Sequence, residues 1–355
     1  MSKGGGALHI AVCTAQVPFV HGGNEVLVEG LVAALRGRGH RVAEIALPFK
    51  WYPRESFMGS VLAWRMIDIT EANGVPVDLA ICTKFPSYVV QHPRKVVWLV
   101  HQYRQAYDWF GTPLSDLTST PDDTRFRRWL ADLDRKTIGE ARGIYAISRN
   151  VAGRLRKYNG LQATPLYPPL RPGFHTGPQG DYILHLNRLD AAKRVDLLLQ
   201  AAALLPRDAA NGLRFVIAGD GPDRAALERQ AASLGLGERV RFAGRVSDAE
   251  AADLYADARA VYYAPVDEDY GFSTVEAFQS GKPVITTSDA GGVLEFVDDG
   301  VTGLVTPPDP ARVAESLARV AADPAAGARM GEAGRARVAG ITWDHVVDTL
   351  LVGAR

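Results

Sequence analysis

The chain has 355 residues, of which 47% are hydrophobic and 23% charged, and its 40 basic side chains balance its 40 acidic ones. This length favours two domains, each large enough to bury its own core, and the composition is ordinary for a soluble globular protein. Cys13 and Cys82 lie in apolar segments, so we interpret them as small buried side chains in a reducing compartment, not as a disulfide framework. The sequence shows neither an apolar run of membrane-spanning length nor a signal-peptide pattern, so we expect a cytoplasmic protein.

The first half of the chain alternates between strand and helix patterns. Short apolar runs predict strands at 8–14, 41–46, 77–82, 95–101 and 143–147. Apolar residues at helical spacing predict helices at 24–38, 122–142 and 148–158. This alternation predicts a parallel sheet covered on both faces, with ligands gathering where loops leave the strand ends.

Two features of this half lie where such a sheet binds ligands. Gly22 and Gly23 precede a predicted helix and could let a diphosphate approach the backbone, although paired glycines are also common in surface turns. The spacing is not Gly-x-Gly-x-x-Gly, which disfavours a dinucleotide-dependent dehydrogenase. His101 follows an apolar strand at its carboxyl end, where chemistry usually lies, and a purely structural histidine is the alternative.

The first half also carries an excess of positive charge. Residues 1–170 hold 21 Lys and Arg against 14 Asp and Glu, a net charge of +7 that the rest of the chain cancels. Residues 47–66 are irregular in pattern and rich in aromatics, and we expect a long loop there. These features fit an acidic acceptor or peripheral contact with the inner face of a membrane, and a solvated face with core aromatics explains them equally well.

Proline and glycine concentrate in 167–173 and 177–180, which marks a domain boundary near residue 168. A second series of strands and helices follows it. Strands are predicted at 182–186, 213–218, 239–242, 261–264, 284–286 and 303–305. Helices are predicted at 194–205, 223–234, 248–256, 292–297, 310–322 and 342–351.

Residues 261–285 carry the strongest functional signal. They read as a strand, a tight loop, a helix and a further strand, with Glu268 on the loop and Glu276 on the helix. Gly271 allows close backbone approach, and Ser273 or Thr274 can cap the helix. Free amides at a helix start suit phosphate, and neighbouring carboxylates suit hydroxyl groups, so the segment suggests a nucleotide-sugar site. An ordinary strand–helix–strand crossover is the alternative.

The order of residues in this segment resembles the Glu-x7-Glu motif of retaining GT-B glycosyltransferases of family 4, the glycosyl transferases group 1. The matching residues are Glu268, Gly271, Phe272, Glu276, Ala277, Gly281, Pro283, Val284 and Ile285. Residues 187–193 resemble the family's Gly-Arg-Leu segment with a following lysine, except that Asn187 stands where glycine is common, and Gly219 opens a Gly-x-Gly-Pro turn.

The resemblance implies an α/β protein with the GT-B fold, in which two Rossmann-like domains with parallel sheets face each other across a cleft. Residues 1–168 would bind the acceptor and 169–340 the nucleotide sugar. The last segment, 341–355, would form a helix that packs back on the first domain, with Trp343 as its anchor.

The resemblance also implies roles for individual residues. Arg188, Lys193 and the amides of Phe272, Ser273 and Thr274 would hold the diphosphate. Glu276 would bind the ribose, while Glu268 and His101 would lie near the transferred sugar. The remaining donor-binding positions are Gly22, Gly23, Gly219, Val246 and Gly271.

The activity implied is transfer of a hexose, with retention at the anomeric carbon, from GDP-mannose or a UDP-sugar to a glycan or lipid-linked acceptor, as in polysaccharide biosynthesis. We expect no cofactor, no nucleic-acid partner and no metal, because a cationic phosphate cradle can replace the metal that Asp267-Glu268-Asp269 would otherwise suggest.

Three other activities stay open on the same fold. A phosphorylase would need a lysine site for pyridoxal phosphate, which we do not find in the sequence. A nucleotide-sugar epimerase would turn over the donor without an acceptor. A non-catalytic binding protein would hold the donor and form no product.

Overall fold

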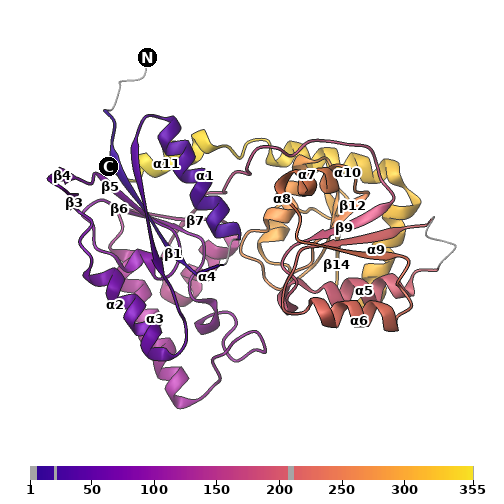
Figure 1. Ribbon diagram of the computed structural model, residues 1–355, viewed down its shortest axis with the longest axis horizontal. Helices are drawn as coiled ribbons and strands as arrows, with labels where there is room; N and C mark the ends of the chain where they lie inside the picture. Colours follow the sequence, from indigo (N-terminus) through magenta and orange to yellow (C-terminus); the bar gives the residue numbers. More distant parts are fainter. Residues whose placement is uncertain (1–5, 20–21, 207–211, 355) are drawn as a thin grey trace. The chain divides into compact units, whose positions relative to one another are not determined.

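The computed structural model describes residues 6–19, 22–206 and 212–354. The chain forms two compact units, coloured along the sequence in Figure 1. The first unit comprises Met1–Pro169 together with Ile341–Arg355, and the second comprises Leu170–Gly340.

The first unit is built on a six-stranded sheet in the order β2-β1-β5-β6-β7-β8, in which all neighbouring strands are parallel. Its strands are β1 (His9–Gln16), β2 (Arg41–Pro48), β5 (Leu79–Cys82), β6 (Lys95–Leu99), β7 (Gly143–Ala146) and β8 (Thr164–Pro165). The central strands β5 and β6 are buried throughout, as expected where helices cover both faces. A short antiparallel pair, β3 (Glu71–Ala72) and β4 (Val75–Pro76), lies outside this sheet.

The helices of the first unit begin and end at recognisable sequence signals. They are α1 (Gly23–Gly37), α2 (Arg54–Met66), α3 (Pro121–Gly139), α4 (Arg149–Asn159), α11 (Trp343–Val352) and the 3-10 turns η1 (Ser87–Val89) and η2 (Arg104–Ala106). Ser148 caps α4 through a hydrogen bond from the Val151 amide, and Gly160 ends that helix in a left-handed conformation.

Helix α2 differs from the long loop expected at 47–66. Phe57, Val61 and Trp64 recur at helical spacing and are buried, so packing of this face against the unit stabilises a helix over Arg54–Met66. The preceding aromatic residues obscured this pattern in the sequence.

The second unit is also a six-stranded parallel sheet, in the order β11-β10-β9-β12-β13-β14. Its strands are β9 (Tyr182–Leu186), β10 (Arg214–Ala218), β11 (Val240–Gly244), β12 (Ala260–Tyr262), β13 (Val284–Thr287) and β14 (Gly303–Thr306). Counted within the unit, this order is 3-2-1-4-5-6, the Rossmann arrangement.

Helices lie on both faces of this second sheet, with α5 packed on α6 and α9, and α8 packed on α10 (Figure 1). They are η3 (Ala191–Lys193), α5 (Val195–Leu204), α6 (Arg224–Ser233), α7 (Asp248–Ala256), α8 (Phe272–Gln279), η4 (Gly292–Glu295), α9 (Pro310–Ala322) and α10 (Pro324–Val338). Helix α10 was not predicted. It is rich in alanine and glycine, and Gly331 and Gly334 let it approach Gly281 and the ring of Phe278 closely.

The last helix, α11, packs on α1 within the first unit. The Trp343 ring lies edge-on to Trp98, with ring centroids 6.3 Å apart, and covers Gly30 of α1. A Cβ atom placed at Gly30 would lie 2.2 Å from Trp343 Cζ2, so only glycine permits this approach.

None of the helices in the described parts of the chain has the length and apolarity needed to cross a membrane.

We expect Gly30→Ala to lower the free energy of unfolding by about 1–3 kcal/mol, because the added methyl group forces Trp343 off α1. Gly37→Ala on the same helix is the matched control, because nothing lies within 4 Å of a Cβ atom there. That control should be neutral or stabilising by up to about 1 kcal/mol. Urea unfolding followed by tryptophan fluorescence measures both, and equal stability of the two variants would contradict the Trp343 contact.

Candidate active site

The second sheet reverses its strand order between β9 and β12. Successive connections run to opposite sides of this position, and in open α/β sheets such a reversal leaves a ligand-binding crevice at the carboxyl ends of the strands. The loop 187–194 follows β9, and the loop 263–271 follows β12. They meet directly, since the Val266 amide donates a 2.8 Å hydrogen bond to the Ala192 carbonyl.

Lys193 and Glu268 form an ion pair where these two loops meet. The Lys193 ammonium donates to Glu268 Oε2, and the Tyr263 hydroxyl donates to the same oxygen over 2.6 Å. Lys193 Nζ also lies 5.6 Å from the centre of the Tyr263 ring. Both charged side chains are only 17% exposed, and the Asp269 amide donates to the other Glu268 oxygen, Oε1, over 3.2 Å.

The protonation of this cluster follows from its contacts. Burial raises the pKa of Glu268, but the charge of Lys193 and the hydrogen bonds from Lys193 and Tyr263 outweigh it, so the pKa lies below its usual range. Burial and the Glu268 carboxylate raise the pKa of Tyr263. At neutral pH, Glu268 is therefore an ionised acceptor and Tyr263 a neutral donor.

Helix α8 begins immediately after this loop. Gly271 precedes it with φ of 88°, and a Cβ atom there would lie 2.8 Å from Val293 Cγ2, so the turn requires glycine. No side chain among the described residues caps the helix, which leaves its first amides suited to an anion. The predicted capping by Ser273 or Thr274 is wrong, because the helix begins at Phe272 and both residues lie inside its first turn.

Asn187 joins the loop after β9 to the start of α8. Its Nδ2 donates to Ser273 Oγ over 2.9 Å, and Ser273 Oγ donates to the Leu186 carbonyl over 3.1 Å. A Cβ atom at Gly219 would lie 1.8 Å from the Asn187 carbonyl oxygen, so this glycine permits the neighbouring loop to approach. Asn187, which stands where glycine is common in the family, therefore links the loop after β9 to the first turn of α8. Its amide side chain, able to donate hydrogen bonds, was the sequence signal for this role.

The remaining predicted positions of the second unit lie around this cluster. Glu276 is half-buried and accepts a 2.8 Å hydrogen bond from the Tyr255 hydroxyl, and burial raises its pKa. The Arg188 side chain is 59% exposed, with Nε 3.6 Å from Asp190 Oδ2. Val246 is half-buried in the loop between β11 and α7. Of these residues, Glu276 has a defined buried partner that the sequence analysis did not name.

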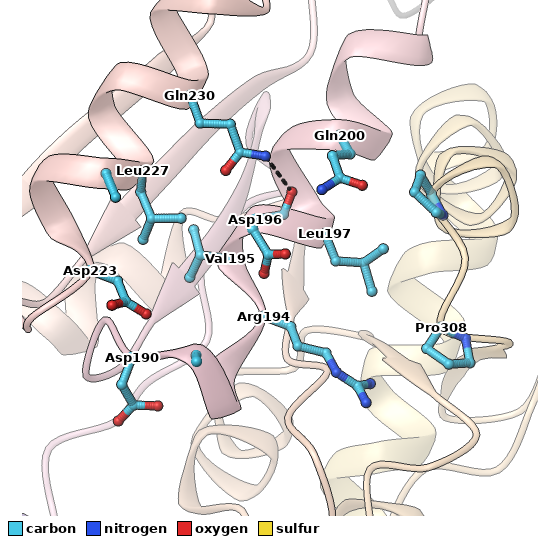
Figure 2. A pocket seen from close by; sticks show the side chains of 13 residues that line it. Asp190, Arg194, Val195, Asp196, Leu197, Gln200, Asp223, Leu227, Gln230 and Pro308 are labelled. Carbon is cyan, nitrogen blue, oxygen red and sulfur yellow. Dashed lines mark hydrogen bonds between the residues drawn. The ribbon is translucent and has the colours of Figure 1, made fainter. Parts of the chain in front are cut away.

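A hollow of about 620 Å³ lies on the other side of the loop after β9, lined mainly by α5, α6 and that loop (Figure 2). Asp190, Asp196 and Asp223 are among its lining residues. Burial raises the pKa of Asp190 despite the nearby charges of Lys193 and Arg188. Three carboxylates oppose an anionic ligand, so the Lys193 side of the loop is the better place for a diphosphate.

The first unit has a corresponding position between β1 and β5, where its own strand order reverses. Gly22 and Gly23 lie at the start of α1, and the Gly22 amide donates a 3.0 Å hydrogen bond to Glu25. Lys84, just after β5, pairs with Glu25 over 3.1 Å. Burial raises the pKa of Glu25, and the charge of Lys84 with its hydrogen bonds brings it below the usual value. The sequence analysis missed Lys84, although it follows a predicted strand end.

His101 lies two residues beyond the end of β6 and is half-buried. One ring nitrogen, Nδ1, is 2.8 Å from the Gln102 carbonyl oxygen. The Phe85 amide donates to the His101 carbonyl over 3.4 Å. His101 therefore stands at the carboxyl edge of the first sheet, as the strand pattern predicts.

A buried polar cluster fixes the backbone next to His101. Gln102 Nε2 donates to Asp134 over 3.1 Å and to Asn159 over 2.8 Å, and the Tyr107 hydroxyl donates to Asp134 over 2.6 Å. Asp134 is fully buried, and its Oδ1 has no hydrogen-bond partner among the described residues. Burial raises the pKa of Asp134 to about 6, although the hydrogen bonds from Tyr107 and Gln102 oppose this.

Among the residues that the structure describes, no group of three or more His, Cys, Asp and Glu side chains is arranged to hold a metal ion. Within the Asp267-Glu268-Asp269 run, Glu268 is paired with Lys193. A metal ion bound by Glu268 would first have to displace Lys193 from that carboxylate.

Comparison with known proteins identifies the second unit. Residues 173–337 match the family model of glycosyl transferases group 1. The second unit is therefore similar to the glycosyl transferases group 1 over nearly its whole length. The Lys193–Glu268 cluster and the start of α8 both lie inside the matched range.

Curated relatives match the same part of the chain. A D-inositol 3-phosphate glycosyltransferase of Frankia alni is 37% identical over 173 residues, which are 46% of this chain and 42% of that protein. The human alpha-1,3/1,6-mannosyltransferase ALG2 is 30% identical over 168 residues, which are 44% of this chain and 40% of that protein. The matches thus span about two fifths of the length of these relatives.

Solved structures resemble both units. Sucrose-phosphate synthase from Thermosynechococcus elongatus gives a TM-score of 0.77 at 20% identity, covering 97% of this chain and 98% of that one. WaaG, a glycosyltransferase of lipopolysaccharide biosynthesis, gives 0.73 at 16% identity, covering 96% and 99%. Anabaena Alr3699/HepE with UDP and glucose gives 0.70 at 18% identity, covering 97% and 99%. The likeness to these structures shows that the chain has the GT-B fold.

We expect Asp134→Asn to stabilise the protein at neutral pH and to leave its stability unchanged below about pH 4. The native carboxyl has a pKa of about 6 against an ordinary 3.8, so the folded state binds a proton more tightly than the unfolded state. Its contribution is therefore fully present at low pH and is lost as the pH rises from about 4 to 6. The lost part is on the order of 3 kcal/mol for this buried group.

Urea unfolding of Asp134→Asn and wild type between pH 4 and pH 7.5 measures this difference. Asp132→Asn is the matched control, since Asp132 lies on the same helix and pairs with Arg135 at the surface. Parallel stability curves for Asp134→Asn and wild type would show that Asp134 has an ordinary pKa.

Proposed function

We propose that this chain is a retaining glycosyltransferase of family 4 that transfers a hexose from a nucleotide-diphosphate sugar to a glycan or lipid-linked acceptor. The observation that carries the proposal is the Lys193–Glu268–Tyr263 cluster beside the uncapped start of α8, at the strand-order reversal of a group 1 unit. This position combines a cation, the first amides of α8 and a hydroxyl acceptor within two adjoining loops. Of those amides, that of Thr274 already donates to the Gly271 carbonyl over 2.9 Å, which leaves Phe272 and Ser273 as the ones we assign to the diphosphate.

The chemistry assigned to the second unit is stabilisation of the departing nucleoside diphosphate. The negative charge on the diphosphate grows as the glycosidic bond breaks, and Lys193 with the first amides of α8 is placed to offset it. Arg188, exposed on the same loop, adds a forked donor that can turn toward the phosphate oxygens. These contacts make the reaction independent of a metal in our proposal.

The two carboxylates are assigned to hydroxyl groups of the donor. Glu268 is ionised and fixed by Lys193 and Tyr263, and it accepts from the hydroxyls of the transferred sugar. Glu276 is oriented by Tyr255 and accepts from the ribose. The Val246 loop, Gly219 and Gly271 supply backbone close to the nucleotide.

We assign acceptor binding to the first unit, with His101 and the paired glycines Gly22 and Gly23 at the carboxyl edge of its sheet. Retention would follow from attack on the same face as the departing phosphate, through a short-lived oxocarbenium-like state. The phosphate itself would take the proton of the acceptor hydroxyl. No covalent enzyme intermediate and no cofactor enters this scheme.

GDP-mannose and UDP-sugars are the donors we propose. The name of the human relative specifies a mannosyltransferase, which supports a mannosyl donor, while Alr3699/HepE was solved with UDP-glucose, which supports a UDP-sugar. We place the protein in the cytoplasm, with the first unit able to contact the inner face of the membrane. Tyr52, Leu62 and Met66, which are exposed on and beside α2, form the surface for that contact.

A nucleotide-release assay tests the transferase. Purified protein is mixed with UDP-glucose, UDP-N-acetylglucosamine, UDP-galactose or GDP-mannose, with and without a pool of glycan and lipid-linked acceptors. We expect acceptor-dependent release of one diphosphate that EDTA does not change. Lys193→Ala should lower the rate by about 100-fold or more, because it removes charge stabilisation in a partly desolvated site. Arg188→Ala and Glu276→Ala should lower it as well.

Arg335→Ala is the matched control, because Arg335 is an exposed arginine of the same unit that pairs only weakly with Glu332, at 3.5 Å. Acceptor-independent turnover would favour an epimerase, and binding without release would favour a non-catalytic protein. If NMR shows that the anomeric configuration of the sugar is inverted in the product, the proposed retention is wrong, while the transferase activity still stands.

A further inference from the structure

Arg194, the residue after Lys193, has an unusual backbone conformation. Its φ of 51° and ψ of 47° lie in the left-handed region, which residues other than glycine rarely adopt. It lies between η3 and α5, so its conformation sets the direction in which the Lys193 segment enters the helix. A left-handed arginine persists only where its surroundings hold it there.

The Arg194 guanidinium supplies that restraint. Nη1 and Nη2 donate to the two oxygens of Asp289 over 2.8 and 2.5 Å, and Nη1 also donates to Thr287 Oγ1 over 3.3 Å. These hydrogen bonds hold the pKa of Asp289 below its usual range. In Figure 2 the Arg194 side chain extends away from Asp190, which lines the same hollow.

The contacts of Asp289 continue to Glu268. The Asp267 amide donates to the Asp289 carbonyl over 2.9 Å, and the Glu268 amide donates to the Ala290 carbonyl over 3.1 Å. Asp267 is itself left-handed, with φ of 43°. The loop after β13 therefore holds the main chain of Glu268 through hydrogen bonds and the side chain of Arg194 through an ion pair.

These contacts close a ring around the donor site. Lys193 is bonded along the chain to Arg194, whose side chain pairs with Asp289. The residue after Asp289, Ala290, accepts from the Glu268 amide, and the Glu268 side chain pairs with Lys193. We propose that the Arg194–Asp289 pair is a positioning clamp that fixes Lys193 relative to Glu268 in the donor site, a role that rests on the transferase function proposed above. It touches neither donor nor acceptor itself.

The exposure of the pair separates this role from simple stabilisation. The Arg194 side chain is 19% exposed and that of Asp289 41%, so the pair is open to water on the Asp289 side and contributes less to stability than a fully buried pair. Loss of the clamp should therefore appear in the rate of the chemical step and only weakly in the unfolding temperature.

Steady-state nucleotide release by Asp289→Asn and Arg194→Gly tests the clamp. Both variants should lower kcat by about 10- to 100-fold, because small misplacements of catalytic groups cost rate. KM for the donor and the unfolding temperature should stay close to wild type. Arg194→Gly is informative because glycine relieves the left-handed strain, so a role confined to the backbone would leave kcat intact. Glu315→Gln, which removes an exposed pair with Arg312 on α9, is the control and should behave as wild type.

The mechanism requires the clamp to act through Lys193. In a Lys193→Ala background, adding Asp289→Asn should change kcat by less than about 2-fold, since coupled residues are not additive. A full additional loss in that background, or a wild-type kcat for Asp289→Asn, would overturn the clamp.

Amide hydrogen exchange without ligand separates failure of the clamp from failure of the transferase. Asp289→Asn should speed exchange in both 190–194 and 264–270, whether or not any donor is turned over. Unchanged exchange in these loops would overturn the clamp even in an active enzyme. Faster exchange in a protein that releases no nucleotide would support it while refuting the proposed function.

Discussion

The arrangement of the second unit depends on keeping Lys193 and Glu268 paired where little water reaches them. Removing two charges from water is costly unless each finds a close partner and its remaining hydrogen bonds. Tyr263 provides one of these bonds as a neutral donor, and burial together with the Glu268 carboxylate raises its pKa further. The two loops meet through the hydrogen bond from the Val266 amide to the Ala192 carbonyl, and Gly271 ends the second loop in a left-handed turn where a Cβ atom would lie 2.8 Å from Val293 Cγ2.

The first unit also places an ion pair where its strand order reverses. Its strand order also reverses, between β1 and β5, and there Glu25 at the start of α1 pairs with Lys84 beyond β5. An acidic residue in the first turn of a helix is favoured by the helix dipole, and the lysine satisfies its second oxygen. Each sheet thus places one ion pair at its ligand-binding edge.

Much of the fold follows from local sequence, while the contacts that complete the site do not. Alternating apolar runs and helical spacing are properties of neighbouring residues, so the strands of the second sheet and the 261–285 segment could be read directly. Helix α10 could not, because its glycines weaken helical propensity and are explained only by the closeness of Gly281 and Phe278. The sequence identified Tyr263 only as part of a strand, and Asn187 only as a replacement for the glycine common in the family. Their hydrogen-bond partners, Glu268 and Ser273, lie 5 and 86 positions away in the chain. The Asp289 contact with Arg194 spans 95 positions and leaves no local signal.

The pairing of Lys193 with Glu268 also has a consequence for the order of events at the site. Before a donor arrives, Glu268 neutralises Lys193 and holds it in one orientation, so the loop is not an open cationic surface that would attract any phosphate. On the proposed function, a diphosphate entering at the start of α8 shares the lysine, and the carboxylate loses part of its compensation. Hydroxyl groups of the transferred sugar are then the donors that restore it. A phosphate without the sugar would leave Glu268 with the hydrogen bonds from Tyr263 and the Asp269 amide but with a weakened pair to Lys193 in a partly desolvated site, which costs binding free energy. The pair therefore favours intact donor over free phosphate, a selectivity that neither the lysine nor the carboxylate would give alone.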